Sequence, residues 1–316
     1  MISRRGVLLG GALLAAPRVV RAGEAMTLLV GAREGTAADQ EARRFLPFLA
    51  RHVRCPIAIL NVAGGGGLAA LTRLAEAAPD GSVLGWTNTP GLSARMVDRG
   101  ADDMLRRLAL LGAVQKEPIV FVSTPAAQLG TAQDLIARSA EDADAVPLGT
   151  PPPGSPPHLA AVRLQALAGS RLNIVAFPSA EAARQAALAG NVAAAVLGIA
   201  TAIGDLREER LVGLGIAAGE RAEALPDLPT LRDAGLELSA FIRRGLVGPP
   251  GVAGAGELQA ALQAVVADEA FRKQAVDGGF IAAWIDGARW TAIAEAERVE
   301  LAKLWATEPW LQEGGG

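Results

Sequence analysis

The sequence has few of the residues that build metal sites, disulfides and aromatic cages. Its 316 residues include one cysteine (Cys55), two histidines (His52 and His158), no tyrosine and only 4% aromatic residues. One cysteine cannot form a disulfide within the chain, and the histidines lie 106 residues apart with no carboxylate cluster beside either. We therefore expect no metal site and no pocket walled by aromatic rings.

The charge balance excludes one class of partner. Lys and Arg number 30 and Asp and Glu number 33, which leaves a net charge of -3. Binding to a nucleic-acid backbone relies on an excess of basic residues, so we expect no nucleic-acid partner. The chain is 51% hydrophobic and 20% charged, which predicts one large or two ordinary folded domains with a substantial core.

The N-terminus has the order of an export signal. Arg4 and Arg5 precede an apolar run over 7–16, and the small residue Ala22 follows. This order predicts a signal over 1–22 that is cleaved after Ala22, and the arginine pair resembles the twin-arginine type. A membrane anchor is the alternative, but the run is shorter than the roughly 20 residues that span a bilayer. We expect a periplasmic protein, with the twin-arginine route as one option.

Strand and helix patterns alternate along the rest of the chain. Short apolar runs predict strands over 26–31, 57–62, 83–86, 108–114, 119–123, 146–150, 173–177, 193–197, 212–217 and 245–248. Apolar residues at helical spacing predict helices over 37–52, 68–77, 132–140, 157–168, 180–189, 256–267 and 286–304. Repeats of this kind predict an α/β protein with parallel sheets and right-handed crossovers.

The number of strands predicts two α/β lobes. The chain would cross between them near Phe121 and return near Ile242, so that one lobe contains 25–121 and 243–316 and the other contains 122–242. In open parallel sheets, ligands bind beyond the carboxyl ends of strands, against helix N-termini that favour anions. The loops at such positions are 31–39, 86–91, 149–158 and 177–180.

Several motifs follow one another in an order found in one receptor family. They are Gly35–Asp39 followed by Ala42-Arg43, Asn61–Gly67, Ala77–Gly81, Gly154–Leu159, Leu225–Thr230 with Asp233–Gly235, and Gly245–Gly251. Together they resemble the periplasmic receptors of the tripartite tricarboxylate transporter family, also called Bug receptors. The resemblance implies a type II periplasmic-binding-protein fold, an α/β fold of two lobes with a hinge and a central cleft. It also implies a receptor, not an enzyme, that closes around a small carboxylated metabolite and delivers it to a membrane transporter or sensor.

The sequence departs from the family pattern in the binding loops. Residues 31–36 replace the family's Pro-Phe-x-Pro-Gly-Gly, 175–179 replace Val-Pro-Tyr-x-Gly, and 190–193 replace Gly-x-Val-Asp. The resemblance therefore implies the architecture but not the identity of the ligand.

The resemblance also implies which groups hold the ligand carboxylate. Gly35, Thr36, Ala37 and Ala38 would supply backbone N–H groups from one lobe, and the Gly154-Ser155 turn would supply them from the other. Small residues let backbone donors approach an anion closely; ordinary strand–helix turns are the alternative interpretation. Further candidates at strand ends and helix starts are Arg33, Asp39, Trp86, Asn88, Thr150, His158, Phe177 and Ser179.

Four of these candidates have a structural alternative. Asp39 either accepts a hydrogen bond from a ligand or caps its helix. Arg33 pairs either with a second ligand carboxylate or, at the surface, with Glu34 or Asp39. His158 either donates to the ligand and senses pH or is a buried histidine bonded to backbone. Trp86 either lines the cleft or packs in the core.

Two other interpretations assign different chemistry. Gly64–Ala69 satisfies the dinucleotide fingerprint between a strand and a helix, so an exported dinucleotide- or cofactor-binding protein is the runner-up. The next strand, however, ends at Asn88 without the acidic residue that would bind a ribose. Ser155 and His158 with a distant Asp39 would suit a hydrolase, but no Gly-x-Ser-x-Gly elbow accompanies them. We expect neither catalytic residues nor a cofactor.

Overall fold

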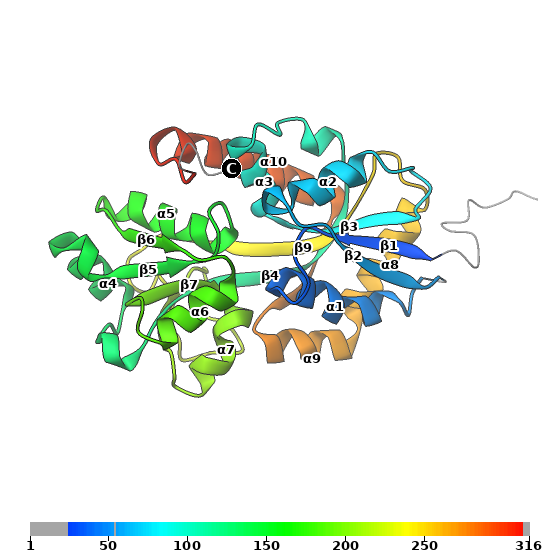
Figure 1. The fold of residues 1–316 in the computed structure, drawn as a ribbon. Coiled ribbons are helices and arrows are strands. Elements are labelled where there is room, and N and C mark those ends of the chain that lie inside the picture. Colours follow the sequence, from blue (N-terminus) through cyan, green and yellow to red (C-terminus); the bar gives the residue numbers. More distant parts are fainter. Residues whose placement is uncertain (1–24, 54, 312–316) are drawn as a thin grey trace, which may run out of the picture.

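The computed structural model describes residues 25–53 and 55–311, so the predicted export signal lies outside the described residues. Figure 1 shows an α/β protein of two lobes, with long strands running between them. No helix over the described ranges is long and apolar enough to cross a membrane. The strands are β1 (Met26–Val30), β2 (Ile57–Asn61), β3 (Val83–Thr89), β4 (Ala109–Ser123), β5 (Pro147–Thr150), β6 (Asn173–Ala176), β7 (Ala194–Gly198), β8 (Val212–Ile216), β9 (Phe241–Gly248) and β10 (Ile281–Asp286). The helices are α1 (Ala37–Leu49), α2 (Leu68–Ala75), α3 (Gly91–Asp98), α4 (Ala132–Glu141), α5 (Pro156–Ala168), α6 (Ala180–Leu188), α7 (Ile199–Arg207), α8 (Ala255–Ala267), α9 (Glu269–Gly278) and α10 (Gly287–Thr307).

The sheet is mixed, although the sequence predicts parallel sheets. In the first lobe β1 pairs in parallel with β2 and β3, and in the second lobe β5 pairs in parallel with β6 and β7. The other pairs are antiparallel: β9 with β3 and β4, β10 with β4, and β4 with β7 and β8. The parallel prediction is wrong for these strands because β4 carries the chain to the second lobe and β9 carries it back.

β4 is one strand of 15 residues where the sequence predicts two. It pairs with β9 as far as Pro118, opposite Phe241, and with β7 from Ile119, opposite Gly198. Proline cannot donate a ladder hydrogen bond and normally interrupts a strand pattern. Pro118 is tolerated here at the point where β4 passes from the sheet of one lobe to the sheet of the other, so β4 and β9 form the hinge.

The predicted elements match the observed ones to within a few residues, except that the sequence does not predict α3, α7, α9 and β10. The buried positions of α3 and α7 include the charged side chains of Arg95 and Asp205, which break the apolar pattern that predicts a helix.

Each lobe has its own apolar core. In the first lobe Phe45 and Phe271 lie on one face of the sheet with α1, α8 and α9, and Trp290 lies on the other face with α2 and α3. In the second lobe Leu148 and Val196 are fully buried in a separate cluster. Burying one such side chain stabilises the fold by roughly 1.5–3 kcal/mol, so each sheet is held by its own helices.

The C-terminal segment joins the lobes at a third place. α10 begins beside β4, and Figure 1 shows its other end above α5. There Leu301 and Trp310 pack with Ala94 of α3 and Leu159 of α5. The hinge strands therefore have a helical strap beside them.

Candidate functional site

The turn between β1 and α1 is held by Asp39, which is 1% exposed. Its carboxylate accepts hydrogen bonds from Gly35 N (2.8 Å), Arg43 Nε (2.9 Å) and Asn61 Nδ2 (2.9 Å). Burial raises the pKa of Asp39, but these bonds outweigh burial and keep the pKa below its ordinary value. Asp39 follows the N-cap residue Thr36 by three positions, so its contacts are those of a residue that fixes the start of α1.

The glycine-rich loop after β2 packs tightly on its neighbours. A Cβ on Gly31 would lie 2.7 Å from the Gly67 Cα, and a Cβ on Gly66 would lie 2.9 Å from the Arg95 side chain. Gly64–Gly67 all have positive φ, a conformation that glycine adopts at little cost. Close packing accounts for these glycines without a dinucleotide.

Arg95 of α3 connects the two lobes. Its side chain, 5% exposed, pairs with Asp98 at 2.5 Å and donates to the carbonyl of Pro153 at 3.1 Å in the turn before α5. A Cβ on Gly154 would lie 1.4 Å from Arg95 Nη2, so only glycine leaves room for the guanidinium. Asp98 also accepts from Trp310 Nε1 (2.7 Å). Burial lowers the pKa of Arg95 and raises that of Asp98, so each depends on the other for its charge.

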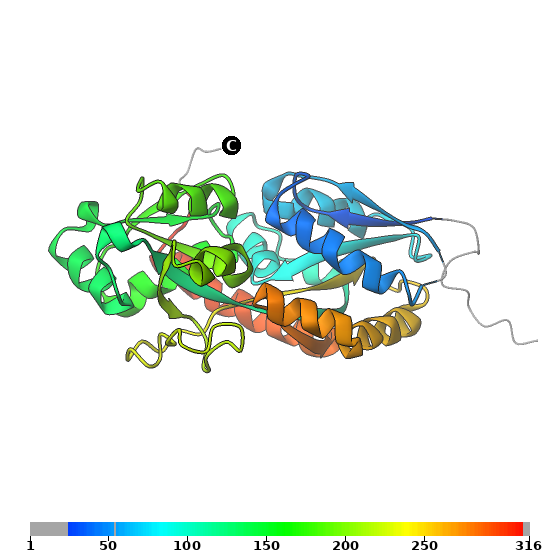
Figure 2. The same cartoon turned by 90° about the horizontal axis from the view of Figure 1, so that it is seen from below.

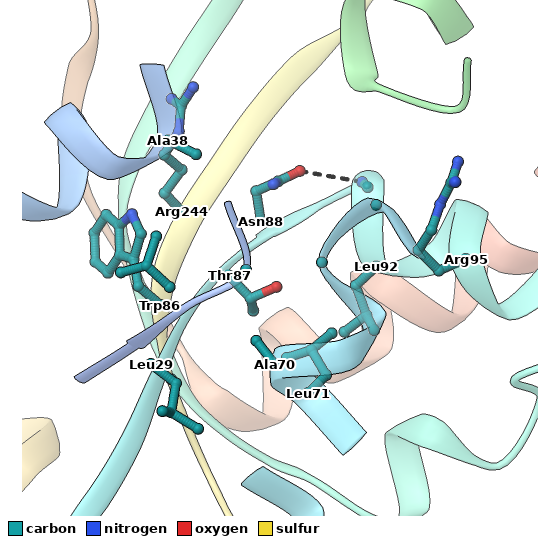
Figure 3. A pocket seen from close by; sticks show the side chains of 16 residues that line it. Leu29, Ala38, Ala70, Leu71, Trp86, Thr87, Asn88, Leu92, Arg95 and Arg244 are labelled. Atoms are coloured by element: carbon teal, nitrogen blue, oxygen red, sulfur yellow. Dashed lines mark hydrogen bonds between the residues drawn. The ribbon is translucent and has the colours of Figure 1, made fainter. Parts of the chain in front are cut away.

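A cavity of about 60 Å³, which we call the lobe 1 cavity, lies beyond the carboxyl ends of β1 and β3. Figure 3 shows Arg244 of β9 on one side of it and Arg95 of α3 on the other. Ala38 and Asn88, both predicted from the sequence, line it. Its volume is well below the roughly 300 Å³ of a small ligand pocket, so it can take only part of a ligand.

A second cavity of about 280 Å³, the inter-lobe cavity, lies between α1 on one side and α6 and α7 on the other. Gly35 and Ala37 line it, together with the ion pair of Arg244 and Glu117. Glu117 also accepts from Ala200 N (3.0 Å) at the start of α7. Burial lowers the pKa of Arg244, but the charges of Glu117 and Glu41 together outweigh burial and raise that pKa. Arg244 lines both cavities, so they adjoin at its side chain, and we call the two together the cleft.

The turn between β5 and α5 carries three buried polar atoms without a hydrogen-bond partner in the described part of the chain: Thr150 Oγ1, Ser155 Oγ and His158 Nδ1. Ser155 holds the N-cap position of α5, yet its side chain makes no capping bond. Burial, with Arg95 nearby, lowers the pKa of His158 to about 4, so the imidazole is neutral at pH 7. Buried polar groups generally have a partner, and a bound molecule could supply one here.

The residues predicted in the first loop differ in their surroundings. Arg33 is exposed, and its carbonyl accepts from Thr36 Oγ1 (2.7 Å). The acidic groups proposed as its surface partners, Glu34 and Asp39, pair with Arg43 instead. The structure therefore leaves Arg33 with its side chain in solvent.

The remaining predicted residues have packing or capping contacts. Trp86 is 5% exposed and stacks on Phe45 with ring centroids 4.6 Å apart, while it also lines the lobe 1 cavity. Phe177 packs against the apolar cluster beneath α6 and α7. Ser179 caps α6, because its Oγ accepts from Ala182 N (3.0 Å).

The sequence reasoning missed Arg95, Glu117 and Arg244. A signal existed for the last two, since Glu117 and Arg244 each interrupt an apolar strand, and buried charges are normally paired. Arg95 had none, because it lies on a helix that the sequence does not predict.

Two α/β lobes, joined by a hinge and enclosing a cleft edged by helix N-termini, define a two-lobed solute-binding protein. The chain belongs to the tripartite tricarboxylate transporter receptor family, because the model for "Tripartite tricarboxylate transporter family receptor" matches residues 42–299. Members of this family are periplasmic solute-binding receptors, not enzymes. The family, the two-lobed fold and the receptor class predicted from the sequence are thereby confirmed.

Individual relatives agree with the family. The protein BugT of Bordetella pertussis is 26% identical over 206 residues, which cover 64% of this chain; the match spans 63% of BugT, less than two thirds of its length. MatC of Rhodopseudomonas palustris, solved with bound malate, has a TM-score of 0.79 at 23% identity over 89% of this chain and 99% of MatC. BugD has a TM-score of 0.80 at 19% identity over 90% of this chain and 97% of BugD. At these identities the two structures show the fold alone.

Proposed function

We propose that this protein is a periplasmic receptor whose lobes close around a small carboxylated metabolite. The observation that carries the proposal is the place of Arg244, which lines both cavities next to the first turn of α1, where Ala37 and Ala38 lie. Guanidinium groups and helix N-termini both favour anions, and a helix N-terminus does so by roughly 0.3–1 kcal/mol or more when partly buried. A ligand carboxylate between α1 and Arg244 would accept from the helix N-terminus and would share the guanidinium with Glu117.

The second lobe would hold the other end of the ligand. Thr150, Ser155 and His158 bring unpartnered buried polar atoms to the β5–α5 turn, and Gly154 brings that turn against Arg95 of the first lobe. A molecule that touches both sides stabilises the arrangement in which the lobes are close, by its differential affinity for that arrangement.

Dicarboxylates are the ligand class that we infer. MatC was solved with malate, and another structurally similar protein, R. palustris Rpa4515, was solved with adipate at a TM-score of 0.79 and 18% identity over 90% of this chain and 97% of that protein. Two guanidinium groups, Arg95 and Arg244, lie on opposite sides of the lobe 1 cavity, and each is paired with a carboxylate of the chain, Asp98 and Glu117. A guanidinium has five N–H donors, so each arginine can donate to one end of a dicarboxylate as well as to its partner in the chain.

Transport and export complete the proposal. The closed protein would present both lobes, 25–121 with 243–316 and 122–242, to a membrane transporter or sensor. The signal over 1–22 would direct the chain to the periplasm, by the twin-arginine route or the general one.

Isothermal titration of the mature chain with malate, adipate and citrate tests the proposal. Thr36→Phe, next to Gly35 and Ala37 of the inter-lobe cavity, and Ser155→Phe, in the β5–α5 turn of the other lobe, should abolish binding. Thr307→Phe, at an exposed position on α10, should leave it unchanged. Binding of NAD that survives both cleft variants would instead support a cofactor site at Gly64–Ala69.

A further inference from the structure

A third cavity lies on the reverse face of the hinge. It has a volume of about 740 Å³ and is lined by Lys116 and Pro118 of β4 and by Phe241 of β9. Glu117 and Arg244, in the same two strands, line the inter-lobe cavity instead. Successive side chains of a strand point to opposite faces, so the hinge strands separate this cavity, which we call the hinge pocket, from the cleft.

Both lobes contribute walls to the hinge pocket. The first lobe supplies α9 and the start of β10, and the second lobe supplies the segment over 218–224 that follows β8. Figure 2 shows the yellow-green loop that contains this segment at the lower edge of the view, to the left of the orange α9. The pocket is within the range of roughly 300–1,000 Å³ that is usual for small-molecule sites.

The walls are mainly apolar and include side chains exposed to solvent. Phe280 and Ala275 are buried beside the pocket, while Val276 is 37% and Ile281 is 48% exposed. Apolar surface left open in a concave site is a common mark of a binding surface.

One cationic group lies at the base of these walls. Lys116 Nζ lies 3.9 Å from the centroid of the Phe241 ring, and the guanidinium of Arg243 lies 5.8 Å from the same ring. Burial and the charge of Arg243 lower the pKa of Lys116, and Glu220 at the exposed rim opposes this effect. The other basic residues of the pocket are engaged, since Arg272 donates to the Val266 carbonyl (3.0 Å) and Arg221 pairs with Asp233 (3.4 Å). Among the described residues Lys116 forms no ion pair and lies against the Phe241 ring, while the two carboxylates of the pocket, Glu220 and Glu223, are exposed.

We propose that the hinge pocket binds an anionic amphiphile, namely a monocarboxylate with an apolar chain. The carboxylate would pair with Lys116, and the chain would lie along Val276, Phe280 and Ile281. Such a ligand would bind favourably for two reasons, because its carboxylate neutralises a half-buried ammonium and its chain covers exposed apolar surface. The hinge pocket is separate from the cleft, so one protein molecule can hold the pocket ligand and the cleft ligand at the same time.

Titration of the mature chain with octanoate tests this proposal, with octylammonium as the probe of reversed charge. We expect saturable binding of octanoate, little binding of octylammonium, and affinity for octanoate about tenfold or more lower in Lys116→Met, which keeps the stem and removes the charge. The matched control Lys303→Met changes a lysine that is 69% exposed on α10 and should bind like the parent protein.

A second variant tests the apolar wall. Ile281→Ser should weaken octanoate binding severalfold, and Leu167→Ser, at a position that is 53% exposed on α5, should not. Absence of saturable octanoate binding, equal binding by Lys116→Met, or equal binding of octylammonium would each overturn the proposal. Malate binding in the same variants separates this outcome from failure of the cleft proposal, since none of these residues lines the cleft.

Discussion

A methyl group at Gly154 should separate the lobes where Arg95 joins them. The new Cβ would lie 1.4 Å from Arg95 Nη2 and 2.7 Å from both Arg95 Cζ and Asp98 Oδ2, so Gly154→Ala must break the bond from Arg95 to the Pro153 carbonyl. A hydrogen bond to a charged group contributes roughly 1.5–3 kcal/mol. Gly154 also has φ +72°, which costs an L-residue roughly 1–2 kcal/mol.

The control for the cost of a positive φ is Gly169→Ala, at the other end of α5. Gly169 has φ +61°, and a Cβ there would meet nothing within 4 Å. Both variants carry the backbone cost, and only Gly154→Ala loses the contact between the lobes. We therefore expect Gly154→Ala to be less stable than Gly169→Ala by roughly 1.5–3 kcal/mol, measured as free energies of unfolding in urea.

Replacing Arg95 and Asp98 tests whether their contact with the new methyl group causes the difference in stability. In a background where Arg95 and Asp98 are both alanine, the atoms that meet the new methyl are gone, and the two glycine variants should become equally stable. Equal stability of the two variants in the parent protein would refute the reasoning. A difference that persists in the double-alanine background would refute it as well.

Three other predictions concern the buried His158, the ion pair of Glu117 and the export signal. Burial lowers the pKa of His158 from 6.5 to about 4, so the unfolded chain binds the extra proton first as pH falls. The free energy of unfolding should therefore drop by about 3 kcal/mol between pH 6.5 and pH 4. Urea unfolding at the two pH values should show that His158→Gln lacks this drop. Glu117→Gln should destabilise by about 3 kcal/mol, because Arg244, 9% exposed, loses the carboxylate that it pairs with and keeps only the more weakly acting Glu41. Glu208→Gln, from a solvent-exposed pair with Arg210, should have a negligible effect on the melting temperature. Replacing Arg4 and Arg5 by lysine should retain the precursor in the cytoplasm if the twin-arginine route is used. If the general route is used instead, immunoblots of periplasmic fractions should show normal export.

Local rules predict from the sequence those residues of the site that lie at turns, helix starts and strand ends. The glycines at 64–67 and 154 mark places where backbone approaches other groups, and Asp39 marks a helix start; these follow from residue type and position. The positions of Ala38 and Asn88 on the lobe 1 cavity also follow, because ligands collect beyond the carboxyl ends of strands.

Long-range pairing explains what the sequence does not predict. Arg95 is buried only because Asp98 and the Pro153 carbonyl meet it, and the latter comes from the other lobe. Arg244 meets Glu117 across 127 residues of sequence. The long, shared β4 strand depends likewise on partners in both sheets, which a local pattern interrupted by Pro118 does not reveal.

A thermal-shift screen of the mature chain tests the central claim most directly. The ligands would be mono-, di- and tricarboxylates, amino acids, NAD and nucleotides, since a ligand that binds only the folded state stabilises it by about 2.7 kcal/mol at 100 times its Kd. We predict a saturable rise in melting temperature with a dicarboxylate that is lost in Ser155→Phe. A rise with NAD or nucleotides alone would contradict the account and place the functional site at the glycine-rich loop.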